Sequence, residues 1–209
     1  MKILKKLKRS IFKRLFRSLI FKNYYNKANT FCLTIDFKIK ELQLKETDKC
    51  LLLAPHADDE SIGCCGLLLR YPKNFTVICL SDGRYSDKFK PIDKLIEERK
   101  LEFDCVMNEL GIKSYIMLGI EDRNLINNFK TFSKIDISNY DFIFLPNFLD
   151  QHMDHKAVTI LLGELIKNKN YKSSLKLGFY EVWSTIIMPN YYVDISEIAE
   201  NKRNIINLY

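Results

Sequence analysis

Residues 50–60 read CLLLAPHADDE, an apolar run that changes abruptly into a histidine and three acids. An apolar run of this length, ended by a proline, predicts a strand that is buried on both faces. A helical pattern follows over residues 59–71, so the polar residues lie where a strand ends and a helix begins. Residues 142–155 read FIFLPNFLDQHMDH and repeat this arrangement, with a helix expected over 151–168.

The alternation of buried strands and helices continues through the rest of the chain. Further apolar runs occupy residues 75–80, 115–120 and 176–183, and a third helix is expected over 91–110. Strands that are apolar on both faces and separated by helices predict an α/β, Rossmann-like fold, with a mainly parallel sheet and helices on both faces. Ligands of such sheets bind beyond the carboxyl ends of the strands, which is where the two polar segments lie.

The polar segments carry all the histidines of the chain, which are His56, His152 and His155. Three consecutive acids beside a histidine concentrate like charge, which is unfavourable unless a cation is present. Imidazole and carboxylate form a ligand set suited to zinc, and three protein ligands with an open position describe a catalytic site. Helix capping by Asp58, Asp59 or Asp150 is the alternative, but it explains one acid per helix and no histidine.

Both segments resemble the motifs of a known family. PHADDE is similar to the P-H-P-D-D-E motif, and DQHMDH to the D-x-H-x-D-H motif, of the LmbE-like or PIG-L family of zinc-dependent de-N-acetylases. The resemblance extends over about residues 49–202. Within it, SDG at 81–83 resembles a T-D-G turn and LGIEDRNL at 118–125 resembles an L-G-x-x-D-G-x-L segment.

The resemblance implies a role for each polar residue of the two motifs. The implied metal ligands are His56, Asp59 and His155, with Zn²⁺ as the ion and Fe²⁺ as its alternative. Asp58 is implied as the general base, and His152 as the group that polarises the acetyl carbonyl. Asp154 is expected to orient one of the histidines, as carboxylates behind metal ligands do.

Three residues outside the two motifs are candidates for substrate binding. Asp122 matches a family position that touches sugar hydroxyls. Arg84 and Arg99 are placed to meet an anionic group of the substrate, with surface or structural ion pairing as the alternative for both arginines.

The activity implied by the resemblance is hydrolysis of a linear amide. The expected substrate is an N-acetylated amino sugar in a glycolipid or surface-glycan precursor, and the products are acetate and a free amine. A soluble N-acetylglucosaminide of the thiol-cofactor-precursor type is a second possibility. The third is a catalytically inactive, membrane-associated relative.

The charge of the chain is concentrated at its N-terminus. Residues 1–30 hold ten Lys or Arg and no acid, whereas the rest holds 23 basic and 26 acidic residues. Apolar residues at helical spacing predict a basic amphipathic helix over 1–28, followed by a deacetylase domain over 29–209 with an edge strand near 31–39. Residues 1–25 suit an anionic membrane surface. Packing on the domain or on a second copy is the alternative, and nucleic acid is disfavoured because the body is acidic.

Cysteine usage and the N-terminus together suggest the compartment. The six cysteines form no C-x-x-C pair and lie mostly in apolar runs, which favours buried free thiols in a reducing environment. No cleavable signal peptide is visible and no apolar run reaches the roughly 18 residues that span a bilayer. We expect a cytoplasmic protein, peripheral at the inner face of the cell membrane, and a homo-oligomer is compatible with the sequence.

Overall fold

The computed structural model describes residues 38–209. The helix predicted over 1–28 and nearly all of the strand predicted over 31–39 lie outside the described residues. The chain divides into two compact units, of which the larger comprises Glu41–Ile186 and Val193–Tyr209. The smaller unit includes Ile187–Tyr192. A two-stranded sheet pairs β1 (Lys40–Glu41) with β7 (Tyr191–Tyr192).

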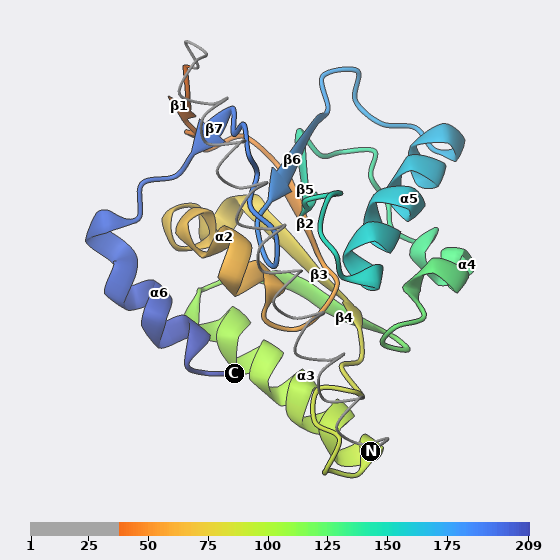
Figure 1. The fold of residues 1–209 in the computed structure, drawn as a ribbon. Helices are drawn as coiled ribbons and strands as arrows, with labels where there is room; N and C mark the ends of the chain where they lie inside the picture. Colours follow the sequence, from red (N-terminus) through yellow and green to blue (C-terminus); the bar gives the residue numbers. More distant parts are fainter. Residues whose placement is uncertain (1–37) are drawn as a thin grey trace, which may run out of the picture. The chain divides into compact units, whose positions relative to one another are not determined.

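The larger unit is built on a five-stranded sheet in which every neighbouring pair is parallel (Figure 1). Its strands are β2 (Cys50–Ala54), β3 (Phe75–Ser81), β4 (Ser114–Ile120), β5 (Phe142–Pro146) and β6 (Lys176–Tyr180). The spatial order is β4-β3-β2-β5-β6, so the chain builds outward from β2 to one side and then to the other. The carboxyl ends of β2 and β5 therefore flank the point where strand order reverses, the usual ligand crevice of such sheets.

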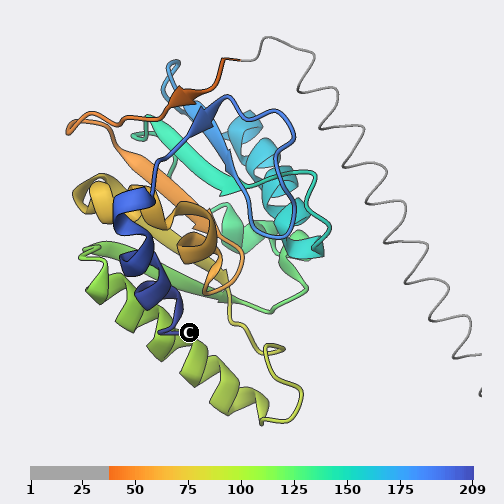
Figure 2. The same ribbon diagram turned by 60° about the vertical axis from the view of Figure 1, so that its left-hand side comes forward.

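Helices cover both faces of this sheet (Figures 1 and 2). One face carries α2 (Asp59–Arg70), α3 (Ile92–Glu109) and α6 (Ala199–Ile206). The other carries α5 (Met153–Asn168) and the single turn α4 (Phe129–Phe132). Short 3₁₀ turns lie at Pro72–Asn74, Leu125–Asn127 and Ser196–Ile198. The predicted α/β fold with a parallel sheet between helices is confirmed.

The central strand β2 shows why the sheet needs cover on both sides. Cys50, Leu52 and Ala54 belong to the apolar cluster that includes residues of α2 and α3, while Leu51 and Leu53 belong to the cluster that includes residues of α5. All five side chains are completely buried. Successive side chains of a strand point to opposite faces, so a strand between two helical layers must be apolar at every position.

Two element boundaries differ from the sequence prediction by more than one residue, for identifiable reasons. Strand β6 ends at Tyr180 rather than at residue 183, and the Trp183 N–H donates to Asp150 instead of to a neighbouring strand. The helix expected from residue 151 begins at Met153 because His152 is its N-cap. Within residues 38–209, no helix has the length and apolar character needed to cross a bilayer.

Candidate metal centre

The two histidine segments meet at the carboxyl ends of the adjacent strands β2 and β5. PHADDE leaves β2 and enters α2, and DQHMDH leaves β5 and leads into α5. The centroid of the His56 ring lies 4.7 Å from that of His152 and 5.5 Å from that of His155. The centroids of His152 and His155 are 5.0 Å apart. Residues about a hundred positions apart in sequence thus form one cluster.

A single carboxylate oxygen joins two of these histidines. Asp59 Oδ2 lies 3.2 Å from His56 Nδ1 and 3.2 Å from His155 Nε2. Two donors of a tetrahedral ion with bonds of about 2.0–2.1 Å lie about 3.3 Å apart. Both distances therefore match the spacing between neighbouring ligands of zinc.

The second nitrogen of each of these histidines faces another carboxylate. His56 Nε2 lies 3.2 Å from Asp154 Oδ2 and 3.3 Å from Asp122 Oδ1, and His155 Nδ1 lies 3.1 Å from Asp150 Oδ2. Histidines that bind metals commonly use their second ring nitrogen in this way, which fixes the tautomer and the ring orientation.

Burial of these polar and charged side chains is energetically unfavourable unless a cation is bound. His155 is completely buried, and neither of its ring nitrogens has a hydrogen bond of good geometry to any described residue. Asp59, Asp150 and Asp154 are also buried, at 1% exposure or less. Buried polar groups are normally paired, and buried like charges repel. The donor set present here therefore fits a divalent cation.

Among the described residues, two triples offer donor atoms that all lie within 4.8 Å of one another: His56, His152 and His155, and His56, Asp122 and Asp154. Asp59 belongs to neither triple, although its Oδ2 lies 3.2 Å from a nitrogen of His56 and 3.2 Å from a nitrogen of His155. Both triples share His56. This histidine is the common element of every candidate ligand set.

The electrostatics of the cluster favour positive charge at its centre. Burial by itself lowers the pKa of His56, but hydrogen bonds to Asp122 and Asp154 outweigh it and raise this pKa to about 12. Burial raises the pKa of Asp59, yet His155 and His56, each with a ring nitrogen 3.2 Å from Asp59 Oδ2, hold it well below its usual range. The carboxylates thus stabilise a cation, whether a proton or a metal.

Asp58 occupies the N-cap position of α2 without capping it. Its side chain makes no hydrogen bond to the helix, and its backbone lies at φ 138° and ψ −28°. Burial, together with the charges of Asp59 and Glu60, raises the pKa of Asp58 to about 7. The capping alternative weighed for Asp58 does not hold, and its carboxylate is available for other use.

His152 is oriented by the start of α5. The backbone N–H of Asp154 donates to His152 Nδ1 at 3.3 Å, so a neutral ring carries its proton on Nε2. Burial and the charges of His56 and His155 lower the pKa of His152. The neutral form, with an Nε2–H free to donate, is favoured.

Both arginines proposed for substrate binding are engaged by carboxylates. The Arg84 guanidinium donates to Asp82 Oδ2 at 2.6 and 2.9 Å, and Asp82 Oδ1 accepts the N–H of Asp122. Arg99 pairs with Glu102 on α3. The ion-pairing alternative describes the structure at both positions, and a contact with substrate stays a prediction for each.

Asp150 was missed by sequence reasoning except as a possible helix cap. It is completely buried, accepts the N–H groups of His152 and Trp183 at 2.9 and 3.0 Å, and contacts His155. It therefore ties two loops to one histidine of the centre. The only signal in the sequence was its place as the first residue of the second motif.

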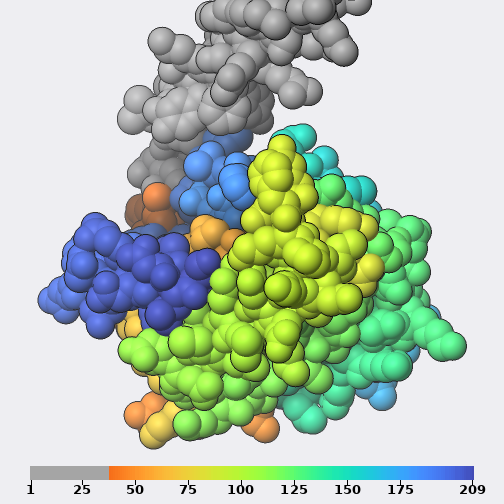
Figure 3. All heavy atoms as spheres, turned by 90° about the horizontal axis from the view of Figure 1, so that it is seen from below, coloured from red at the N-terminus to blue at the C-terminus, as the bar shows by residue number. Residues whose placement is uncertain are grey.

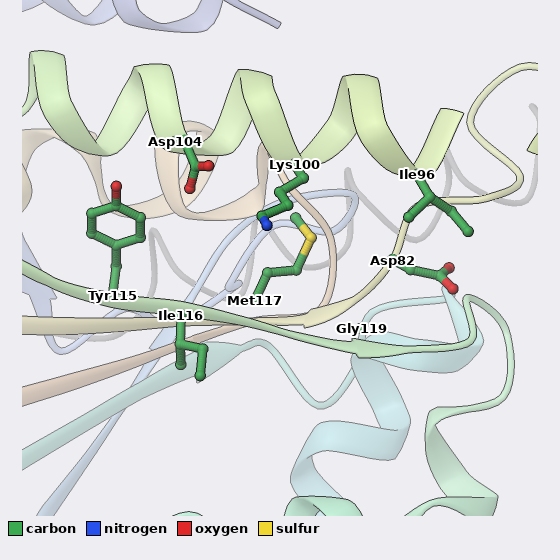
Figure 4. A pocket seen from close by; sticks show the side chains of 8 residues that line it. All are labelled: Asp82, Ile96, Lys100, Asp104, Tyr115, Ile116, Met117 and Gly119. Carbon is green, nitrogen blue, oxygen red and sulfur yellow. The ribbon is translucent and has the colours of Figure 1, made fainter. Parts of the chain in front are cut away.

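A separate hollow of about 360 Å³ lies between α3 and the edge strand β4 (Figure 4). Its lining includes Ile96 and Lys100 from the helix and Ile116 and Met117 from the strand. No histidine lines it, and Asp82 is its one link to the cluster described above. The candidate centre is therefore distinct from this hollow.

Fold and site together define an α/β protein with a histidine–carboxylate centre at the carboxyl edge of its sheet, the construction of a metal-dependent hydrolase. Residues 51–166, more than half of the chain, match the family described as GlcNAc-PI de-N-acetylase, or PIG-L. The chain belongs to this family. The resemblance read from the two motifs is confirmed.

Solved structures with the same fold include enzymes of more than one reaction type. N,N′-diacetylchitobiose deacetylase from Pyrococcus horikoshii is 22% identical, with a TM-score of 0.61 over 77% of this chain and 69% of that one. The zinc-inhibited form of teicoplanin deacetylase Orf2 is 13% identical, with a TM-score of 0.58 over 77% and 83%. GalB, a 4-carboxy-2-hydroxymuconate hydratase from Pseudomonas putida KT2440, is 16% identical, with a TM-score of 0.60 over 78% of each chain. These likenesses show the fold, and the reaction must be argued from the site.

Proposed function

We propose that the chain is a zinc-dependent N-deacetylase that hydrolyses the acetamide of an N-acetylated amino sugar. The observation that carries this proposal is the position of Asp59 Oδ2, 3.2 Å from a nitrogen of His56 and 3.2 Å from a nitrogen of His155. Membership of a de-N-acetylase family supports the reaction type.

The proposed metal ligands are His56, Asp59 and His155. This set leaves a carboxylate for the second nitrogen of each histidine, whereas a set of His56, Asp122 and Asp154 would leave Asp59 and His155 buried without a cation. When bound, zinc supplies a Lewis acid that polarises a carbonyl and eases the deprotonation of water. Fe²⁺ would serve the same ligands.

Asp58 is proposed as the general base and acid. It accepts a proton as the oxygen of water bonds to the acetyl carbon, and it returns the proton to the nitrogen as the carbon–nitrogen bond breaks. The products are acetate and a free amine. A pKa near neutrality suits a group that must accept and then donate a proton, and in the metal-free protein burial and the charges of Asp59 and Glu60 raise the pKa of Asp58 to about 7.

His152 is proposed to stabilise the negative charge that develops on the acetyl oxygen. Its Nδ1 is occupied by the Asp154 N–H, which directs the proton of the neutral ring to Nε2. A donor that is already fixed before the reaction stabilises an oxyanion without reorganisation during it. Asp154 would act on His56 through the 3.2 Å contact at Nε2.

Acetate release tests the proposal directly. Purified protein is incubated with N-acetylated sugars, among them N-acetylglucosaminyl lipids and N-acetylglucosaminides, with zinc and after removal of zinc by a chelator. Release that depends on zinc is expected. Folded, zinc-loaded protein that releases acetate from none of these sugars would contradict the proposal.

An inactive relative is the second candidate, and Asp58→Asn distinguishes it. This variant should keep one zinc per chain because the ligands are untouched. Its kcat should fall by about 10²–10⁴-fold, the usual contribution of a general base. Equal turnover in wild type and variant would show that Asp58 is not the general base.

The lipid-linked substrate is proposed from the charge of residues 1–30 and not from the centre itself. Ten cations without an acid would bring the protein to an anionic leaflet. Deletion of residues 1–25 should abolish sedimentation with vesicles that contain anionic lipid and should lower activity on a lipid-linked sugar. Activity on a soluble N-acetylglucosaminide should stay unchanged. If binding and lipid-linked activity both survive the deletion, a soluble substrate is favoured.

A further inference from the structure

Glu60 is a completely buried carboxylate next to the proposed ligand Asp59, and the mechanism above does not use it. Its two oxygens have different partners. Oε1 accepts the hydroxyl of Ser61 at 2.6 Å and that of Tyr209 at 2.7 Å. Oε2 accepts the backbone N–H of Asp58 at 3.2 Å. One side chain thus connects Tyr209 to the backbone of the proposed base.

The backbone of Asp58 needs such support. A φ of 138° is uncommon for a residue other than glycine, and such conformations persist only where surrounding contacts fix them. The Asp58 carbonyl accepts the N–H groups of Ser61 and Ile62, at 3.0 and 2.9 Å, which fixes one side of the residue. On the other side of the residue, the Asp58 N–H is fixed by its hydrogen bond to Glu60.

Tyr209 is itself held in place by its connection to α6 and by contacts with Arg99 of α3. It follows α6, which lies beside α3 at the surface of the larger unit (Figure 3). Arg99 of α3 donates to the main-chain oxygen of Tyr209 at 3.3 Å, and its guanidinium lies 5.8 Å from the centre of the Tyr209 ring. The tyrosine hydroxyl therefore reaches Glu60 from a position that is fixed by α3.

We propose that Tyr209 is a positioning residue of the active site. Its hydroxyl fixes Glu60, and Glu60 in turn holds the strained backbone of Asp58 so that its carboxylate keeps one place beside the metal ligands. This inference rests on the proposed role of Asp58. It also assigns Arg99 a function in the molecule that differs from substrate binding, because Arg99 anchors Tyr209.

Tyr209→Phe tests the proposal, and Tyr180→Phe is its matched control. The Tyr180 hydroxyl donates to the Leu53 carbonyl at 2.8 Å. This hydrogen bond has a similar length and lies in the same apolar cluster, but it involves neither Glu60 nor Asp58. Both variants lose one tyrosine hydroxyl bond to a completely buried residue and should melt at similarly reduced temperatures. A role in stability alone would affect them equally.

Two measurements separate positioning from stability. In Tyr209→Phe we expect kcat to fall at least tenfold with KM within twofold of wild type and zinc content unchanged, while Tyr180→Phe keeps its kcat. By amide hydrogen exchange, followed by NMR in the metal-free protein, the Asp58 N–H should exchange faster in Tyr209→Phe than in Tyr180→Phe. Unchanged exchange at Asp58, unchanged kcat, or equal losses of kcat in both variants would each overturn the proposal.

The exchange measurement also keeps the two proposals apart. If the wild-type protein releases no acetate, the proposed function fails, yet the exchange rate of the Asp58 amide still reports whether Tyr209 holds this backbone. If acetate is released and exchange at Asp58 does not respond to Tyr209→Phe, only the positioning role fails.

Discussion

Both ring nitrogens of His56 face carboxylates. Nδ1 faces Asp59, and Nε2 faces Asp122 and Asp154. Gathering these acids in a buried pocket would be costly if each stayed unpaired. A proton on His56 offsets part of that cost in the metal-free protein. A divalent ion offsets more of it, so metal binding and protonation compete for the same place.

This competition predicts that zinc binding at pH 7 releases protons. In the metal-free centre the pKa of His56 is raised to about 12, and although burial lowers the pKa of His155, the adjacent carboxylates of Asp59 and Asp150 raise it overall. Ligand nitrogens must lose their protons, so the affinity for zinc should increase as the pH rises. Calorimetric titration in two buffers of different ionisation enthalpy measures the release. A heat of binding that is the same in both buffers would contradict it.

Substitution of two neighbouring acids should separate the candidate ligand sets. Asp59→Asn should lower the zinc content of purified protein from about one ion per chain to near zero. Asp122→Asn, the matched change on the other side of His56, should keep most of the zinc, because Asp122 contacts only the second nitrogen. Metal analysis by mass spectrometry gives both values. The reverse result would assign the ion to His56, Asp122 and Asp154.

The residues of the two motifs could be predicted from the sequence because three histidines and consecutive acids are rare and lie at strand ends. The long-range contacts of Asp150, Asp82 and Tyr209 could not be predicted in the same way. Each of these residues bonds to a distant segment, as Tyr209 does to Glu60 at 2.7 Å, and a pair 149 positions apart leaves no local pattern.

Among the elements, helix α2 shows that packing decides whether a Cβ added at a glycine stabilises or destabilises the fold. Gly63, in its middle, faces Tyr180 of β6 so closely that an added Cβ would overlap the tyrosine ring. Gly163, in α5, has no atom within 4 Å of the corresponding position. Alanine has the higher helix propensity at both sites, so only packing distinguishes them.

Alanine substitutions at these two glycines should therefore change stability in opposite directions. Gly63→Ala should lower the free energy of unfolding by about 1–3 kcal/mol through overpacking. Gly163→Ala should raise it by about 0.5–1 kcal/mol because a flexible residue is removed from a helix. Urea denaturation of both variants measures the difference. Two changes of the same sign would show that the packing of α2 on β6 is not as described.

The five parallel strands and the three long helices of the larger unit followed from periodicity, because buried parallel strands and amphipathic helices have distinct patterns. The short helices α4 and α6 were not predicted. Helix α6 has one buried residue, Ile205, and such a segment carries little periodic signal. The end of β6 was missed because a side chain, Asp150, takes the Trp183 N–H that a longer strand would have used.

For the whole molecule, the order of the strands brings the two histidine segments together. β2 and β5 are neighbours at the point where strand order reverses, although 87 residues lie between the end of β2 at Ala54 and the start of β5 at Phe142. Each strand delivers one polar segment to the same edge. The fold could be predicted from the sequence, but a hydratase shares it, so the fold alone does not define the reaction.

The most direct test of the central claim is the position of a metal ion in crystals grown with zinc, located by anomalous diffraction at the zinc edge. We expect one peak at about 2.0–2.2 Å from His56 Nδ1, Asp59 Oδ2 and His155 Nε2. A peak bound instead by His56 Nε2, Asp122 and Asp154, or no peak at this edge of the sheet, would contradict the claim.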